Sequence, residues 1–317
     1  MPTLSVEVLR GEGDINFKGF AIGNGYLDQS FLGNSLIYFG YYHGLYDSKV
    51  WSDLVQNCCN NEKNVKKCDF VNNRNQSCSQ AVDTASAFIH EPGLNVYNLY
   101  SDCEGQSTLN QNTSLKHSRE YFDRKLMIKT LNRINEKQLI QGLKDTPPCV
   151  DTSYVEKWIN QKTVRKALHI PDSVDDWSAC SLTVEMGYTT LYKTMKPQLT
   201  ELLSSPKNLK GLVYNGDVDM ACNFLGDEWF AIKFQIQYFS IISSYHRFVE
   251  DLGLKLIRGY DIWHYKKQIA GFYKVYDRLG FATVRGSGHM VPTDKAGAAL
   301  LMFQTFVNSE ANNFGFK

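Results

Sequence analysis

The sequence lacks an excess of charge of either sign. Its 34 lysines and arginines nearly balance its 33 aspartates and glutamates, which leaves a net charge of +1. Nucleic acids and anionic membranes attract proteins through a marked positive excess, so neither partner is expected. Because 43% of the residues are hydrophobic and 21% are charged, the chain can bury a large core, and disorder throughout is not expected.

Long apolar runs are also missing. The most apolar stretch, residues 229–244, is interrupted by Lys233, Gln235 and Gln237, whereas a spanning helix needs roughly 20 mostly apolar residues. Residues 1–14, MPTLSVEVLRGEGD, contain no basic patch followed by an apolar segment, so they do not resemble a secretion signal. We therefore expect neither a membrane segment nor a leader peptide in this sequence.

Cysteine, in contrast, is clustered. Eight cysteines are present, and four of them fall between residues 58 and 78. Such clustering favours disulfides and an oxidising compartment. Free thiols are one alternative, and a zinc site is another, although the spacings C-x2-C and C-x2–4-H do not occur. Glycosylation sequons at Asn75 and Asn112 fit the oxidising compartment.

Short apolar runs alternate with helical spacing along much of the chain. Strands are expected where apolar runs end in turn residues, at 15–22, 210–214 and 281–284. Helices are expected at 35–44, 154–170, 189–203 and 296–307. Asp47 is placed to cap a further helix. Strands that alternate with helices predict an α/β fold.

Two of these strands end in residues with catalytic chemistry. Tyr214-Asn-Gly-Asp-Val-Asp-Met220 follows one strand, and Gly286-Ser-Gly-His-Met-Val-Pro292 follows another. Catalytic groups of α/β sheets gather at the carboxyl ends of strands. An acid followed by a histidine is the second half of the Ser…Asp…His order of α/β-hydrolases. Turn or capping roles remain alternatives for these residues, and the pattern does not choose between Asp217 and Asp219.

The nucleophile of such a triad is not evident. The serine elbow G-x-S-x-G presents the hydroxyl above the sheet, but no serine here lies between glycines four positions apart. Gly19 and Gly23 flank an alanine, and Gly40 and Gly44 flank a tyrosine. The sequence therefore offers an acid and a base without the group that they would activate.

Six separated segments resemble the serine carboxypeptidases, of the cathepsin A group. They follow the family's order and cover nearly the whole chain: 17–28, 34–45, 95–103, 164–171, 214–230 and 286–299. The resemblance implies an α/β-hydrolase fold with an inserted helical, disulfide-bonded cap. It also implies a serine-type carboxypeptidase activity that needs no cofactor and no metal.

Individual roles follow from the same resemblance. Asp219 takes the position of the catalytic acid, and His289 that of the catalytic base. Met290 and Tyr97 fall where the family lines the pocket for the substrate's last residue.

The cysteines can be matched in the same way. The resemblance implies the pairs Cys58–Cys78, Cys59–Cys68 and Cys103–Cys149. Cys180 corresponds to a cysteine whose partner lies in the family's N-terminal region, and Cys222 corresponds to an unpaired one.

The sequence departs from the family in two places. The family's serine motif G-E-S-Y-A-G lies just before a segment P-T-L, and here Pro2-Thr3-Leu4 follows Met1 directly. We therefore predict that the first strands and the nucleophile elbow are missing, and that this chain alone is inactive. Residues 231–248 interrupt the family pattern. We interpret them as a retained intron or a gene-model error, and the alternative is a real lineage-specific insertion.

The expected organisation has three parts. Residues 1–27 form the first part of the hydrolase core. Residues 28–150 form the cap, with an excisable loop around 104–148. Residues 151–317 form the second part of the core and carry the suspected insertion.

Three functions are weighed. The first is a carboxypeptidase that acts on peptides in lysosomes or outside the cell. The second is a non-catalytic scaffold for lysosomal glycosidases, and the third is an acyltransferase on the same framework. Peptide substrates are the expected partners, with glycosidases and a second copy of the chain as further candidates.

Overall fold

The structure is a computed structural model of the 317-residue chain. It describes all residues except 12, 60–67, 90–92, 104–148, 182–183, 185–186, 234–253, 311–312 and 317. The chain divides into two compact units. The first contains Met1–Ala85, Tyr97–Leu99 and Tyr192–Lys317, and the second contains Ser86–Val96 and Tyr100–Leu191. The predicted excisable loop at 104–148 lies outside the described residues, as does the suspected insertion except for residues 231–233.

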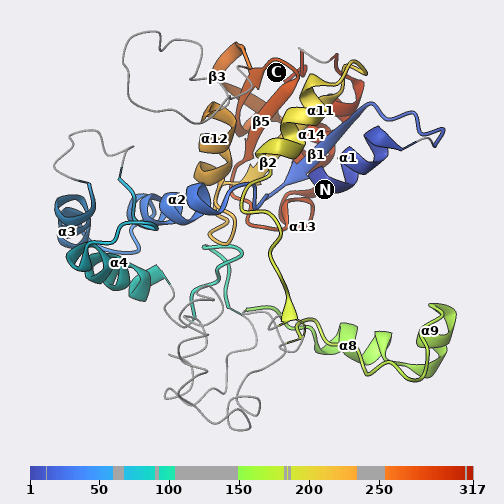
Figure 1. The fold of residues 1–317 in the computed structure, drawn as a ribbon, viewed down its shortest axis with the longest axis horizontal. Helices are drawn as coiled ribbons and strands as arrows, with labels where there is room; N and C mark the ends of the chain where they lie inside the picture. Colours follow the sequence, from blue (N-terminus) through green and yellow to red (C-terminus); the bar gives the residue numbers. More distant parts are fainter. Residues whose placement is uncertain are drawn as a thin grey trace. The chain divides into compact units, whose positions relative to one another are not determined.

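A five-stranded mixed sheet organises the first unit, in the order β1-β2-β5-β4-β3 (Figure 1). Three strands run parallel: β1 (Gly19–Gly23), β2 (Lys210–Gly216) and β5 (Leu279–Val284). The other two, β3 (Leu256–Tyr265) and β4 (Gln268–Tyr276), add an antiparallel hairpin beside β5. The carboxyl ends of the three parallel strands consequently lie at one edge of the sheet, where catalytic groups of α/β folds gather.

The central strands are buried on both faces. Val213 and Phe281 belong to one apolar cluster, whereas their neighbours Leu212 and Ala282 belong to another. This alternation follows from the two-residue period of a strand. All six residues of β5 are buried, as expected of a strand covered on both sides.

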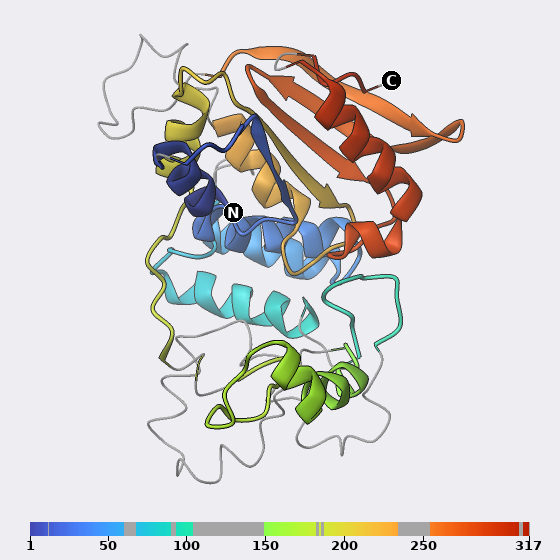
Figure 2. The same cartoon turned by 90° about the vertical axis from the view of Figure 1, so that its right-hand side faces the viewer.

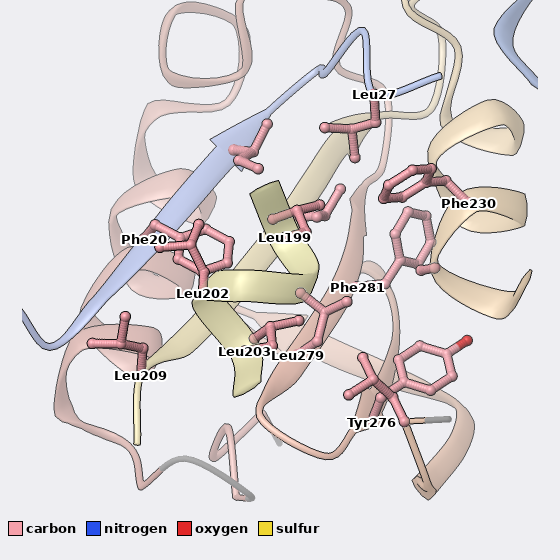
Figure 3. Close-up of a cluster of buried hydrophobic side chains, with 14 of the residues drawn as sticks. Phe20, Leu27, Leu199, Leu202, Leu203, Leu209, Phe230, Tyr276, Leu279 and Phe281 are labelled. Atoms are coloured by element: carbon pink, nitrogen blue, oxygen red, sulfur yellow. The ribbon is translucent and has the colours of Figure 1, made fainter. Parts of the chain in front are cut away.

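Helices on the two faces complete these clusters. Figure 2 shows α1 (Pro2–Arg10) and α11 (Lys196–Ser204) on one face and α14 (Ala296–Asn308) on the other. Leu199, Leu202 and Leu203 of α11 pack toward the sheet with Phe230 of α12 (Phe224–Lys233) (Figure 3). The leucines lie at helical spacing, so the buried stripe explains why this segment is a helix.

Four further helices among the described residues belong wholly or partly to the first unit. Asp28 caps α2 (Gln29–Tyr42) by accepting hydrogen bonds from the Ser30 and Phe31 amides. Asp47 caps α3 (Ser48–Cys58) through the Val50 amide at 2.9 Å, which confirms its predicted role. Helix α4 (Gln76–Ile89) follows, and the short α13 (Val291–Asp294) precedes α14.

The second unit contains α8 (Ser153–Ile159) and α9 (Lys162–Ala167). The prediction of one continuous helix over 154–170 was wrong. The helix stops at Asn160, whose side chain hydrogen-bonds the backbone of Trp177 in both directions at 2.8 Å. Asparagine favours such local bonds with the backbone over a helix interior.

The predicted extents of two other elements were also wrong. The helix expected at 189–203 begins only at Lys196, because Thr194 forms an antiparallel bridge with Asp28 and the flanking residues hydrogen-bond to Leu27 and Gln29. The strand expected at 15–22 begins only at Gly19, because tight turns of the backbone occupy residues 13–17. The strands at 210–214 and 281–284 and the helix at 296–307 are confirmed.

Three disulfides are present: Cys58–Cys78, Cys59–Cys68 and Cys103–Cys149. These are the pairs that the resemblance implies, and neither Cys180 nor Cys222 belongs to any of them. The third bridge closes the chain around residues 104–148.

Among the described residues, no helix is long and apolar enough to cross a bilayer. The predicted domain boundaries at 27/28 and 150/151 stay predictions.

Candidate active site

The acidic residue lies just beyond the carboxyl end of β2. Asp219 is fully buried. The turn that carries it is fixed to the neighbouring strand's loop, since the Asp217 amide donates to the Val284 carbonyl and the Val218 amide to the Ser287 carbonyl. A carboxylate on so short and well-anchored a turn has little freedom to move.

The histidine lies beyond the carboxyl end of the next strand, β5. Its Nδ1 is 2.9 Å from Oδ2 of Asp219. The loop reverses at Gly286, whose φ of +68° is left-handed and costs glycine little. The structure thus brings together the acid and the histidine that the sequence places on separate strand ends.

The two aspartates of the D-x-D segment have different contacts. Asp219 faces His289, whereas Oδ1 of Asp217 accepts a hydrogen bond from the Gly286 amide at 2.6 Å. Asp217 therefore holds the turn that leads to the histidine, and burial raises its pKa. The choice that the sequence left open is settled by geometry in favour of Asp219 as the partner of His289.

The Asp219 carboxylate is surrounded by donors. Its Oδ1 accepts from the Ala221 amide at 2.9 Å and the Cys222 amide at 3.3 Å. Its Oδ2 accepts from Nδ2 of Asn24 at 2.8 Å, beside the bond with His289. These four contacts compensate the burial of a negative charge. The hydrogen bond to Asp219 raises the pKa of His289, although partial burial of the ring opposes the change.

A second buried carboxyl, that of Asp227, lies close to Asp219. Asp227, in α12, is almost completely buried, and its Oδ2 accepts from the Gly25 amide and from Nδ2 of Asn215, both at 3.0 Å. Burial raises the pKa of Asp227 to about 8 despite these bonds. Asp227 is therefore neutral at acidic pH, and it ties the turn after β1 to the end of β2.

Residues Tyr97–Leu99 hydrogen-bond to both the Asp219 loop and the His289 loop. The Leu99 amide donates to the Val218 carbonyl at 3.0 Å, and the His289 amide donates to the Tyr97 carbonyl at 2.6 Å. A Cβ on Gly288 would lie 2.1 Å from the Tyr97 carbonyl oxygen, so this backbone approach requires glycine. The three residues act as a strap across the acid and histidine loops.

Side chains at the strap add a further link. Oδ2 of Asp294 accepts from Nδ2 of Asn98 at 3.0 Å and from the Gly288 amide at 2.7 Å. The His289 loop is consequently held from the strap on one side and from α13 on the other.

The two predicted pocket residues both lie next to the histidine. The Tyr97 ring centroid is 5.6 Å from that of His289. Met290 follows His289 directly, and its side chain is 59% exposed. An exposed, flexible apolar side chain and an aromatic ring beside a histidine can form one wall of a substrate pocket.

Within the described part of the chain, the remaining predicted residues make no side-chain hydrogen bond with Asp219 or His289, and Cys222 takes part only through its backbone amide. The Cys222 thiol is largely buried, and this burial raises its pKa, so it is a weak nucleophile. Asn75 is exposed at the start of α4, where its side chain accepts from the Ser77 amide. Asn112 lies outside the described residues.

Sequence reasoning missed Asn24, Asn98, Asp227 and Asp294. Asn24 occurs in Gly23-Asn-Gly25, the turn residues that end the predicted strand at 15–22. Its partner Asp219 lies 195 positions away, so no local pattern could reveal the contact. The Gly-Asn-Gly turn at the carboxyl end of a predicted parallel strand was the one usable signal.

Comparison with known proteins is consistent with this geometry. The family model for serine carboxypeptidases, peptidase S10, matches residues 1–309. The chain belongs to the serine carboxypeptidase family. The lysosomal protective protein of Mus musculus is 37% identical over 98% of the chain, and the serine carboxypeptidase ctsa-4.1 of Caenorhabditis elegans is 32% identical over the same share.

A solved carboxypeptidase structure shares the fold. Kex1(Δ)p, a prohormone-processing carboxypeptidase from Saccharomyces cerevisiae, superposes with a TM-score of 0.55 over 95% of this chain, at 19% sequence identity. The chain therefore has the α/β-hydrolase fold. It covers 62% of the mouse protein, 61% of the nematode protein and 57% of the yeast chain, so it spans about three fifths of their length.

Proposed function

We propose that the chain supplies the acid and the base of a serine-type carboxypeptidase, which releases C-terminal residues from peptides. The observation that carries the proposal is the 2.9 Å contact between Nδ1 of His289 and the fully buried Asp219. A buried acid bonded to Nδ1 leaves Nε2 as the atom that exchanges protons with a nucleophile. This is the arrangement that a serine hydrolase needs.

The proton movements follow from that arrangement. A serine hydroxyl attacks the carbonyl carbon of the last peptide bond while Nε2 of His289 takes its proton. The imidazolium then gives the proton to the departing amine, and a water molecule repeats the sequence to free the enzyme. Asp219 stays ionised, fixes the tautomer and stabilises the imidazolium, which accords with the raised pKa of His289.

Substrate contacts are proposed for two residues. Tyr97 and Met290 lie beside His289 and would contact the side chain of the residue that is released. A ring and a thioether tolerate many apolar side chains.

A lysosomal or extracellular location is proposed for the protein. Its support is the three disulfides, which persist in oxidising compartments, and the 37% identity to a lysosomal protein. Asn75 is exposed and is the proposed glycosylation site within the described part of the chain. The scaffold role toward glycosidases stays a prediction from the resemblance.

We further propose that the 317 residues alone do not hydrolyse peptides, because no serine lies in a G-x-S-x-G motif. Loss of a triad nucleophile removes roughly six orders of magnitude in rate. The chain alone should neither release an amino acid from an N-blocked dipeptide nor react with an organophosphorus serine reagent.

The matched experiment joins the chain behind a segment that supplies G-E-S-Y-A-G before Pro2. This form should react with the reagent and hydrolyse the dipeptide, and His289→Gln should abolish both. Histidine-dependent hydrolysis by the 317 residues alone would refute the proposed inactivity. Failure of the joined form to hydrolyse, although it folds, would refute the carboxypeptidase assignment.

A further inference from the structure

Asn24 combines two unfavourable features. Its φ of +46° is left-handed, a conformation that is uncommon for residues with a Cβ, although asparagine adopts it more readily than most. Its side-chain oxygen Oδ1 is buried and has no hydrogen-bond partner in the described part of the chain, which is rare because such atoms lose their hydration without compensation. Local backbone strain and unsatisfied polar atoms are concentrated at functional sites.

The amide nitrogen of the same side chain makes one contact that can explain both features. Nδ2 donates to Oδ2 of Asp219 at 2.8 Å. This is the oxygen that meets Nδ1 of His289 at 2.9 Å. The other oxygen of Asp219 is already held by backbone amides, so the donor from Asn24 determines how Oδ2 is presented to the histidine.

The place of Asn24 is fixed independently of its side chain. Its backbone amide donates to the Tyr214 carbonyl at 2.8 Å and so continues the pairing of β1 with β2. The next amide, that of Gly25, donates to Asp227, which also binds Asn215. The turn is therefore braced from two sides, and a change of the side chain alone leaves these bonds in place.

We propose that Asn24 is a positioning residue that orients the Asp219 carboxylate toward His289. The proposal rests on the proposed function only in naming His289 as the base. Asn24 does not need to touch substrate. Its amide sets the angle of Oδ2 and shares the negative charge of that oxygen with the imidazole.

Asn24→Gly tests this directly. Glycine accepts the left-handed backbone, so the substitution removes the amide and the unsatisfied Oδ1 without adding strain. Asn208→Gly is the matched control, because Asn208 is also left-handed, with a φ of +53°, but is exposed in the turn before β2. Asn24→Asp is a second variant that keeps the size of the side chain and replaces the donor by an acceptor.

Two quantities are measured on each variant of the 317-residue chain. The first is the pKa of His289 by NMR titration of its ring protons, with the resonance identified among seven histidines by its loss in His289→Gln. The second is the urea midpoint of unfolding. Neither readout requires enzymatic activity, so a failure of this inference is distinguishable from a failure of the carboxypeptidase assignment.

We expect Asn24→Gly to keep or raise the urea midpoint and to raise the pKa of His289 by about half a unit or more, because Oδ2 then shares its charge with the imidazole alone. Asn24→Asp should raise the pKa of His289 further, and Asn208→Gly should leave it unchanged. A lower midpoint in Asn24→Gly with an unchanged pKa of His289 would show that Asn24 only stabilises the turn, and the inference would be wrong. Loss of cooperative unfolding in Asn24→Gly would overturn it equally.

Discussion

The buried carboxyl of Asp227 should make the stability of the fold depend on pH. The folded protein holds the proton because burial raises the pKa of Asp227 from the ordinary 3.8 to about 8. An unfolded chain releases the same proton near its ordinary pKa. Between these two pH values the folded state binds more protons than the unfolded state, so stability is highest in acid and falls as the pH rises.

The magnitude follows from the displacement of the pKa. Each pKa unit corresponds to about 1.4 kcal/mol, so the rise from about pH 5 to about pH 8 should remove about 4 kcal/mol of unfolding free energy. Domains of this kind are stable by only about 5–15 kcal/mol. A single buried carboxyl would then account for a large share of the stability lost on leaving an acidic compartment.

Asp227→Asn isolates this contribution. The amide resembles the protonated acid, because its oxygen can still accept from the Gly25 amide and from Asn215. Urea unfolding followed by tryptophan fluorescence at the two pH values should show about 4 kcal/mol less pH dependence of the unfolding free energy in the variant. Asp53→Asn, which removes a half-exposed carboxylate of α3 that pairs with Lys49 at 3.2 Å, should show nearly the same pH dependence as the unaltered protein. Equal pH dependence in Asp227→Asn and the unaltered protein would refute the reasoning.

Three further outcomes are expected. Asp219→Asn should lower the pKa of His289 toward its ordinary value, as measured by NMR titration, because the bond that raises it loses its charge. Asn98→Asp should speed hydrogen exchange of the His289 amide by about tenfold, because it places two carboxylates together. The double variant Asn98→Asp with Asp294→Asn swaps the two side chains and should restore the protection of this amide. Asp47→Ala should lower the unfolding free energy by about 1 kcal/mol through loss of the α3 cap.

Each of these outcomes has a clear contrary result. An unchanged pKa in Asp219→Asn would mean that Asp219 does not raise the pKa of His289. If the His289 amide still exchanges rapidly in a folded double variant, the hydrogen bond between residues 98 and 294 does not stabilise the His289 loop. A cost well below about 0.5 kcal/mol in Asp47→Ala would show that water replaces the cap.

The sequence predicted the strand ends that carry Asp219 and His289, because apolar runs closed by Gly, Asn and Asp are local signals. It did not predict the hairpin of β3 and β4. The turn of that hairpin is formed by Lys266 and Lys267, both with positive φ, and lysine gives no sign of such a conformation. Tertiary contacts impose this turn on residues that do not favour it.

The contacts that hold the site could not be predicted for a related reason. The strap residues Tyr97–Leu99 and the turn residue Asn24 each bind a loop more than a hundred positions away in the chain. No periodicity or local propensity encodes the partner of such a bond. The resemblance to the family implied which residues are the acid and the base, and the structure added the residues that hydrogen-bond to their loops.

The most direct measurement is dipeptide hydrolysis by the chain joined behind a segment that contains G-E-S-Y-A-G. We predict release of the C-terminal amino acid, a loss of at least about a thousandfold in kcat/KM in His289→Gln, and no more than a small change in Asn208→Gly. Hydrolysis that persists within about tenfold in His289→Gln would contradict the assignment of His289 and Asp219 as the base and acid of this protein.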